Sequence, residues 1–276
     1  FFTKFLYDIK MLDCQEPFSN LLTQGMVLKD GAKMSKSKGN VISPEEIIGQ
    51  YGADTARLFI LFASPPERDL EWSDQGVEGC YRFLNRVWRL VQDYRHYFHE
   101  DPAEIKPDSF NPIDKELYYK VHATIKKVSA DIEERFNFNT AISAIMELCN
   151  QLNSYREAPD KNAALIKLAI ENLLILLSPF SPHICEELWE MTGHTESVHH
   201  QPWPQYDPQA LILDEVEMVI QISGKVKERI NVPLNTPRED LEQIALNNSK
   251  IIALTEGRKI IKIIVVPNKL INIVIN

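Results

Sequence analysis

The spacing of the hydrophobic residues changes once along this chain, and that change constrains the fold more than any other feature. From about residue 74 to about residue 190, apolar residues recur every three or four positions, as on one face of an amphipathic helix. After a segment at 194–208 that is rich in His, Pro and Gln and that we interpret as a linker, the spacing falls to two, as in a half-buried strand. The helical stripes are Val77, Tyr81, Leu84, Trp88 and Val91; Leu117, Val121, Ile125, Val128 and Ile132; Ile142, Ile145, Leu148 and Leu152; and Leu165, Leu168, Leu173 and Leu176. We therefore predict a mainly α chain in which a helix bundle precedes a small α+β domain.

Short motifs indicate where several helices begin. Ser43-Pro44-Glu45-Glu46 combines a Ser N-cap, Pro at the first helical position and Glu three residues after the Ser. Ser181-Pro182 repeats the first two of these signals, and Asp54 can cap a helix that Ser64-Pro65-Pro66 ends. The motifs predict two short helices within 41–63 and another bundle helix from residue 181.

The segment 214–276 has the pattern of a ββαββ domain. Apolar and polar residues alternate at 216–222, Ser223-Gly224 provides a turn, and a hairpin partner follows. Thr236-Pro237-Arg238-Glu239 resembles a capping box, and Gly257 can close the helix that it opens. The remaining expected elements are strands at 226–232, 260–266 and 270–275.

Charge and composition narrow the class of protein. No window approaches the ~18 to 20 uncharged apolar residues of a membrane span, and we expect no membrane partner. The net charge of −9 argues against a nonspecific nucleic-acid coat. Residues 214–276 nevertheless carry nine Lys or Arg against eight Asp or Glu, and residues 29–38 hold four lysines and one Asp. Both segments are candidate contacts for phosphates.

The cysteines and the first residues indicate the cellular compartment of the protein and the longer chain to which it belongs. Cys14, Cys80, Cys149 and Cys185 show neither a CxxC motif nor the spacing of metal ligands, so we expect reduced thiols and no metal site. The N-terminus is no signal peptide and opens inside an apolar stretch without Met, which we interpret as a cut from a longer chain. We expect a cytoplasmic monomer.

Lys33-Met34-Ser35-Lys36-Ser37 is the segment with the strongest chemical signal. Gly25, Gly31 and Gly39 surround it, so the loop can move and approach a ligand closely. Two lysines with hydroxyls between them can stabilise the negative charge that spreads over phosphate oxygens in a phosphoryl- or nucleotidyl-transfer transition state. A lysine-rich turn that merely faces solvent is the alternative.

These five residues resemble the signature loop of class I aminoacyl-tRNA synthetases in its full form. The longer run GMVLKDGAKMSKSKGN at 25–40 and the run YGADTAR at 51–57 are similar to those of the leucine, isoleucine and valine enzymes. LFASPPERDLEW at 61–72 is most similar to the bacterial leucine enzyme, and PFSPHICEELW at 179–189 resembles a bundle motif of the same subgroup. SGKVK at 223–227 resembles an Asn-Gly-Lys motif of the leucyl C-terminal domain, with Ser223 in place of Asn. The resemblance covers essentially the whole chain.

The resemblance implies a C-terminal part of a leucyl-tRNA synthetase. The parent would activate leucine with ATP, with Mg²⁺ expected, and transfer it to tRNA(Leu). Lys36 and Lys33 would be the catalytic residues, and Lys33, Met34, Ser35, Lys36 and Ser37 would contact ATP. The implied divisions are 1–70, the end of the catalytic core with its stem-contact helices; 71–200, a bundle like an anticodon-binding domain; and 214–276, a tRNA-binding domain. The chain has no His-x-Gly-His element, so we expect it to be inactive alone.

Six basic residues are candidate contacts for tRNA. Arg82 and Arg86 lie on one helix beside its apolar stripe, where a solvated face is the alternative. Arg57 could meet the tRNA or pair with an acid such as Asp54. Lys225, Lys227 and Arg229 alternate along one predicted strand and would share a face, unless they serve only to protect a sheet edge.

Two other readings stay open at this point. An isoleucyl, valyl or methionyl synthetase shares the signature loop, although the ββαββ ending fits the leucine enzyme better. A synthetase-derived RNA-binding protein without catalysis is the alternative from another class, and the intact loop argues against it.

Overall fold

The computed structural model describes residues 1–99, 104–133, 136–212, 215–233 and 236–276. The chain forms two compact units, Phe1–Asp207 and Pro208–Asn276. Residue 214, where we expected the small domain to begin, lies outside the described residues. No helix among the described residues is long and apolar enough to cross a membrane.

The first unit opens with short elements that carry the signature loop. Helix α1 (Phe2–Asp8) is followed by a three-stranded sheet in the order β2-β1-β3, formed by β1 (Val27–Lys29), β2 (Ala32–Lys33) and β3 (Leu70–Glu71). Strand β1 is antiparallel to β2 and parallel to β3. A 3-10 turn (Lys36–Lys38) lies between β2 and helix α2 (Pro44–Tyr51), and α3 (Ala53–Ala63) follows. The two short helices predicted within 41–63 are present.

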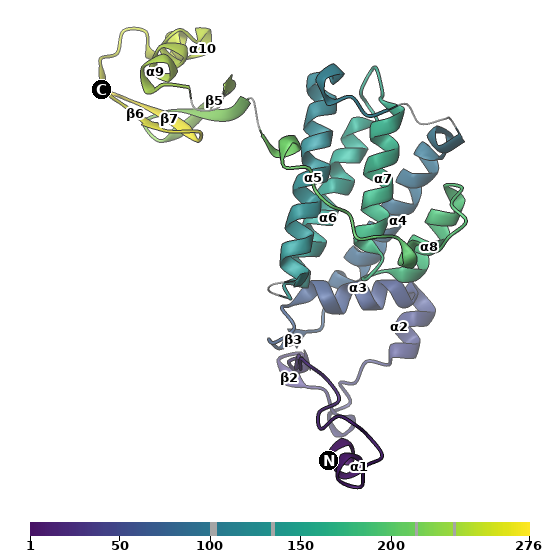
Figure 1. Ribbon diagram of the computed structural model, residues 1–276. Helices are drawn as coiled ribbons and strands as arrows, with labels where there is room; N and C mark the ends of the chain where they lie inside the picture. Colours follow the sequence, from purple (N-terminus) through teal and green to yellow (C-terminus); the bar gives the residue numbers. More distant parts are fainter. Residues whose placement is uncertain (100–103, 134–135, 213–214, 234–235) are drawn as a thin grey trace. The chain divides into compact units, whose positions relative to one another are not determined.

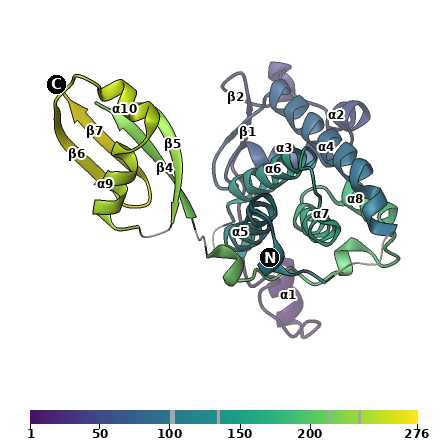
Figure 2. The ribbon, with the colours of Figure 1, turned by 90° about the horizontal axis from the view of Figure 1, so that it is seen from above.

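The bundle predicted from the helical stripes is also present (Figures 1 and 2). Its helices are α4 (Asp74–Tyr94), α5 (Pro112–Glu133), α6 (Phe138–Tyr155), α7 (Ala163–Leu177) and α8 (Pro182–Met191). Short 3-10 turns at Arg95–His99, Pro107–Ser109 and Val198–His200 connect or follow them. Side chains of Ser73 and Asn162 cap α4 and α7 by accepting the N–H of Gly76 and of Leu165.

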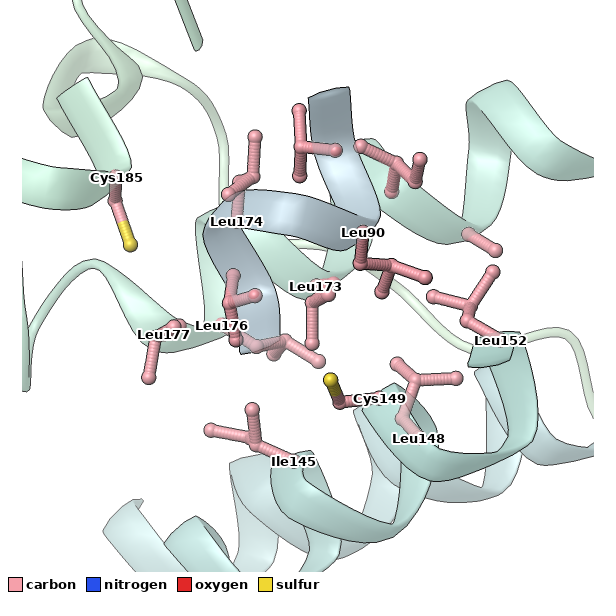
Figure 3. Packing of buried hydrophobic residues seen from close by; sticks show 14 of the residues in the cluster. Leu90, Ile145, Leu148, Cys149, Leu152, Leu173, Leu174, Leu176, Leu177 and Cys185 are labelled. Atoms are coloured by element: carbon pink, nitrogen blue, oxygen red, sulfur yellow. The ribbon is translucent and has the colours of Figure 1, made fainter. Parts of the chain in front are cut away.

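One continuous apolar core holds this unit together. Leu90 on α4, Leu148 on α6 and Leu173 on α7 are fully buried and face one another in Figure 3. Burying one such side chain stabilises the fold by about 1.5–3 kcal/mol. The same core includes Leu58 and Phe59 of α3, so α3 packs with the bundle that follows it in the sequence.

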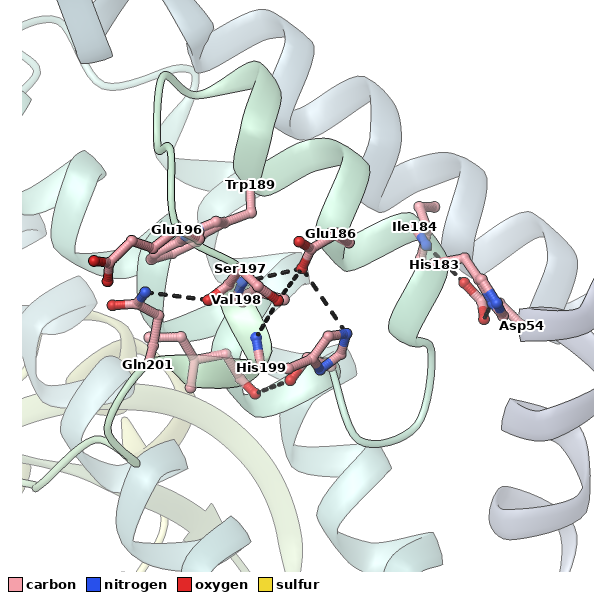
Figure 4. Close-up of polar contacts among 12 residues, drawn as sticks. Asp54, His183, Ile184, Glu186, Trp189, Glu196, Ser197, Val198, His199 and Gln201 are labelled. Carbon is pink, nitrogen blue, oxygen red and sulfur yellow. Dashed lines mark hydrogen bonds and ion pairs between the residues drawn. The ribbon is translucent and has the colours of Figure 1, made fainter.

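Residues 194–207 of the predicted linker (194–208) are bound along the bundle. Glu186 on α8 accepts the hydroxyl of Ser197 at 2.9 Å and the N–H of Val198 at 3.0 Å (Figure 4). Further along, the indole N–H of Trp203 donates to Ser129 Oγ at 2.8 Å on α5. His, Pro and Gln are common in linkers, and the sequence did not show that polar contacts hold this segment to the bundle.

The second unit is a four-stranded sheet with two helices (Figure 1). Its strands are β4 (Glu215–Ile222), β5 (Lys225–Pro233), β6 (Ile260–Val266) and β7 (Leu270–Ile275), in the order β5-β4-β7-β6. The single helix that we predicted is split into α9 (Arg238–Leu246) and α10 (Ser249–Thr255), because Asn248 accepts the N–H groups of Lys250 and Ile251 and starts a new helix. Its core contains Met218, Ile220, Leu241, Ile251, Ile271 and Ile273.

Candidate nucleotide and tRNA sites

The signature loop extends from a tight hairpin. Strands β1 and β2 are joined by Asp30 and Gly31, whose φ angles of 56° and 70° are those of a two-residue turn that requires positive φ at both positions. After β2, Ser35 is extended, residues 36–38 form the 3-10 turn, and Gly39 takes the left-handed conformation with φ 69°. The loop therefore leaves the hairpin and reverses within six residues.

The side chains that we predicted to contact ATP lie together on this loop. Lys33, Lys36 and Ser37 are exposed, whereas Met34 and Ser35 are half-buried. The Ser35 and Ser37 hydroxyl oxygens lie 3.1 Å apart. Neither lysine has an ion-pair partner among the described residues. Both ammonium groups are thus available to an anionic ligand.

Asn40 is a residue of this loop to which sequence reasoning gave no role. Its Oδ1 accepts the N–H of Ser35 at 2.9 Å, and its Nδ2 lies 3.4–3.5 Å from the carbonyl oxygens of Lys29, Ala32 and Lys33. One amide side chain thereby contacts both strands of the hairpin and the loop. Asn40 ends the run at 25–40 that resembles the family, and this was the only sign in the sequence that it could matter. Its contacts depend on the folded loop.

Residues just before the bundle hold the hairpin. Glu71 accepts the N–H of Gly31 at 3.0 Å, and Asp69 accepts the N–H of Met26 at 2.8 Å. The N–H of Gly25 donates to Pro66 O at 2.7 Å, and a Cβ at Gly25 would lie 2.2 Å from the carbonyl oxygen of Arg68. Only glycine permits this close approach.

Arg57 and Asp54 on helix α3 do not form the pair that was one of the two alternatives for Arg57. Arg57 donates from Nη2 to Pro179 O at 3.2 Å, and Asp54 accepts from Ile184 N–H at 2.7 Å and lies 2.8 Å from His183 Nδ1 (Figure 4). The Arg57–Asp54 pair was therefore wrong. The two side chains instead bind the start of α8, because α3 crosses that end of the bundle.

The two arginines predicted on α4 are exposed and have protein contacts. Arg82 lies 3.8 Å from Glu78 one turn away, and Arg86 donates to Asn150 on α6 at 3.2 Å and lies over the Phe83 ring. An exposed pair of this kind contributes little to stability. Their proposed contact with tRNA stays a prediction.

The three cations predicted to share a face of the hairpin do not. The β4–β5 register shifts between Ile220 and Gln221, so Arg229 pairs with Val219 but Lys225 pairs with the buried Ile222. Cross-strand partners point to the same face, which places Arg229 and Lys225 on opposite faces, with Lys227 at the bulge. Arg229 is also bound to Glu217 at 2.6 Å. A one-residue bulge inverts the alternation that we assumed.

Other cations join Lys225 and Lys227 at one end of this sheet. Ile222 pairs with Ile273, and Ile273 pairs with Ile263, so the start of β5 and the start of β6 lie at the same end. Arg258, Lys259 and Lys262 lie at that start of β6 and are exposed. We call Lys225, Lys227, Arg258, Lys259 and Lys262 the cationic end; none of them has an ion-pair partner among the described residues. The start of β5 and the start of β6 are about 14 Å apart, because three spacings between neighbouring strands separate them.

The described residues hold no group of three His, Cys, Asp or Glu side chains that could bind a metal ion. Three of the four cysteines, Cys80, Cys149 and Cys185, are buried, and Cys14 is exposed. Both candidate sites present exposed lysine or arginine side chains.

Comparison with known proteins gives the family. The family model "tRNA synthetases class I (I, L, M and V)" matches residues 1–73, and the model "Anticodon-binding domain of tRNA ligase" matches residues 114–244. The agnB2 LeuRS of Agrobacterium radiobacter K84, solved as a ternary complex with tRNA and LeuAMS, matches with a TM-score of 0.74 and 33% identity. That match covers 100% of this chain and 36% of the LeuRS chain. The chain belongs to the class I aminoacyl-tRNA synthetases and spans about a third of the length of that relative.

Proposed function

We propose that this chain is the C-terminal part of a leucine–tRNA ligase that activates leucine with ATP and transfers it to tRNA(Leu). The observation that carries the proposal is the similarity to a LeuRS over the whole chain, through the small second unit. The family model of the first residues spans the isoleucine, leucine, methionine and valine enzymes, so it leaves the amino acid open. The small sheet domain after the bundle favours leucine.

Class I synthetases use ATP, and the signature loop supplies the groups that would act on its phosphates. Formation of an aminoacyl-adenylate breaks the bond between the α- and β-phosphates and releases pyrophosphate. Lys36 and Lys33 would stabilise the charge that develops on the departing pyrophosphate, with Ser35, Ser37 and Met34 shaping the loop. Mg²⁺ is expected to bind with the ATP phosphates in the intact enzyme, because it is commonly held by substrate phosphates.

Loop cations alone do not orient an amino acid against ATP, and orientation supplies a large share of such rate enhancements. We therefore expect the 276-residue chain by itself to show no leucine-dependent ATP–pyrophosphate exchange. Exchange by the purified chain would contradict this expectation.

The activity is tested in an intact synthetase that carries this sequence. ATP–pyrophosphate exchange is measured with leucine, isoleucine, valine and methionine in turn, with and without Lys36→Ala. We expect exchange with leucine alone and a loss of about 100-fold or more in kcat for the variant, the range reported for removing one transition-state donor. Exchange with another amino acid would keep the mechanism and change the substrate.

The cationic end extends the proposal to tRNA. Lys225 and Lys227 were expected to contact tRNA; Arg258, Lys259 and Lys262 now join them, because they lie at the same end of the sheet and form no ion pair with any described residue. Arg229 leaves this set, since the bulge places it on the opposite face from Lys225 and Glu217 lies 2.6 Å from it. Arg57, Arg82 and Arg86 remain candidates, and Arg57 is the weakest of them because its guanidinium already donates to Pro179 O.

The salt dependence of tRNA binding tests the cationic end. In Lys227→Ala/Lys259→Ala/Lys262→Ala, the slope of log K against log[salt] should fall by about two to three, because each phosphate contact contributes about 0.7–0.9. Arg229→Ala is the matched control and should leave the slope unchanged. Equal slopes for the triple variant and the unaltered chain would exclude these lysines as phosphate contacts.

A synthetase-derived RNA-binding protein is the second candidate. The cationic end would serve it equally well, so the two candidates differ only at the signature loop. A folded, tRNA-binding intact protein that exchanges pyrophosphate with none of the four amino acids would favour this candidate.

A further inference from the structure

We infer that Asn40 is a positioning residue for the signature loop: its side chain ties the loop to the hairpin and thereby sets where Lys33 and Lys36 stand. This inference rests on the proposed function of the loop lysines. It concerns a residue that contacts no phosphate in the proposal and acts through the backbone of its neighbours.

The geometry places Asn40 at the base of the loop. Its Oδ1 accepts the N–H of Ser35 at 2.9 Å, which closes a ring from residue 35 to residue 40 around the 3-10 turn. Its Nδ2 lies 3.4 Å from Lys33 O and 3.5 Å from Ala32 O and Lys29 O. The side-chain orientation is fixed by chemistry, because only the oxygen can face the Ser35 N–H and only the nitrogen can face carbonyl oxygens.

The contacts fall on either side of Met34. The carbonyl of Lys33 and the N–H of Ser35 both bind the Asn40 side chain. One amide therefore holds the backbone of Lys33 and the backbone that precedes Lys36. Gly39 supplies the reversal that brings Asn40 back to this position, with φ 69°. Without the amide, the loop would have to order these residues at the moment of reaction, which costs backbone conformational entropy.

Pre-positioned cations matter more in the transition state than in the ground state, where the phosphate charge is smaller. Loss of Asn40 should therefore lower kcat more than it raises the KM for ATP. A loss of about tenfold in kcat corresponds to one net hydrogen bond of about 1.4 kcal/mol.

The experiment has two arms. In the 276-residue chain, hydrogen exchange of the Ser35 amide is compared for the unaltered chain and Asn40→Ala, with Gln50→Ala as control because Gln50 is an exposed amide on α2 that contacts Tyr51. In an intact synthetase that carries the sequence, ATP–pyrophosphate exchange is measured for Asn40→Ala, Gln50→Ala and Lys36→Ala. We expect Ser35 exchange to accelerate and kcat to fall about tenfold in Asn40→Ala, with the KM for ATP within about twofold.

Each alternative outcome has a distinct meaning. If Lys36→Ala lowers kcat but Asn40→Ala does not, the positioning role of Asn40 is wrong and the proposed function stands. If Lys36→Ala leaves kcat unchanged, the proposed function of the loop fails and the role of Asn40 fails with it. Unchanged Ser35 exchange in Asn40→Ala overturns the inference without reference to activity. Should Asn40→Ala lose its helical circular dichroism, Asn40→Asp replaces it: this variant keeps the Ser35 acceptor but no donor, and an unaltered kcat there overturns the donor contacts.

Discussion

The carboxylate of Asp54 accepts the backbone N–H of Ile184 at 2.7 Å, so a side chain on α3 caps the first turn of α8 (Figure 4). Asp54 is 8% exposed, and His183 Nδ1 lies 2.8 Å from its other oxygen. A carboxylate at a helix N-terminus satisfies a free N–H and interacts favourably with the helix dipole. Helix α3, which comes after the signature loop in the sequence, is thus joined to α8 by a buried polar contact.

Asp54→Ala should destabilise the first unit. The change removes a buried, charge-assisted cap, for which we expect a loss of about 2 kcal/mol and a fall in Tm of about 4–8 °C for a unit of this size. His183→Ala leaves the Ile184 contact in place and should have a smaller effect. Thermal melts followed at 222 nm check this prediction, and equal melting of Asp54→Ala and the unaltered chain would contradict it.

His122 should make stability depend on pH. Burial lowers the pKa of His122 below its ordinary 6.5, against a smaller raising effect of Asp207, and Nδ1 accepts the N–H of Asp207 at 3.0 Å. The unfolded chain therefore takes up the proton first as the pH falls. The contribution of neutral His122 to the free energy of unfolding is fully present above pH 6.5 and is lost progressively below it.

Urea unfolding at several pH values between 7.5 and 5 measures this contribution. The free energy of unfolding should decline over this range, and the decline should be smaller in His122→Gln, which has no titrating ring. Tyr118 and Lys126 also contact residues 206–207 from the same helix, and they are the same in both chains, so they do not contribute to the difference. Parallel pH profiles for the two chains would show that His122 does not couple to folding.

The sequence predicted the bundle well because its stripes follow directly from burial. Val77, Leu84 and Val91 are all buried on α4, as the period of 3.6 requires. The cap motifs marked where helices begin but not which atoms cap them. Ser43 and Ser181 make no side-chain cap bond, and Asp54 from another helix caps α8. Contacts across the fold are not encoded in local spacing.

The candidate sites were predicted unevenly for a related reason. Lys33 and Lys36 were found because the motif is contiguous, whereas Asn40 acts only through the folded hairpin. On β5, a single bulge separated Arg229 from Lys225, and sheet order rather than sequence brought Lys262 to the same end. Residues that meet through topology are not visible to a strand-by-strand reading.

Cys14 should be the fast-reacting thiol of the native chain. It is exposed, whereas Cys80, Cys149 and Cys185 are buried, and burial raises the pKa of Cys80 and of Cys149 to about 11. At pH 8, only about one in a thousand of such thiols is ionised, and the thiolate is the reactive form. Titration with a disulfide reagent should give one fast equivalent, and four in denaturant. A fast phase that persists in Cys14→Ser would show that a buried thiol is accessible.

Gly25→Ala should loosen the hairpin without unfolding the bundle. A Cβ at Gly25 would lie 2.2 Å from Arg68 O and 2.7 Å from Asp69 N, so the backbone must move apart. The same segment holds two hydrogen bonds between strands, from Leu70 N to Met26 O and from Trp72 N to Leu28 O, both 2.8 Å. Amide exchange at Leu70 and Trp72 should accelerate. The bundle helices should keep their protection, because Gly25 is not part of the apolar core that holds them together.

Gly79→Ala is the matched control for this change. Gly79 lies inside α4 with open space where its Cβ would stand, so alanine should stabilise the helix by up to about 1 kcal/mol. Hydrogen exchange by mass spectrometry compares both variants with the unaltered chain. If Gly25→Ala left Leu70 and Trp72 as protected as Gly79→Ala does, the hairpin would be held by contacts other than the close approach of Gly25 to Arg68. The hairpin would then owe its position to Glu71 and Asp69, whose carboxylates accept the N–H groups of Gly31 and Met26.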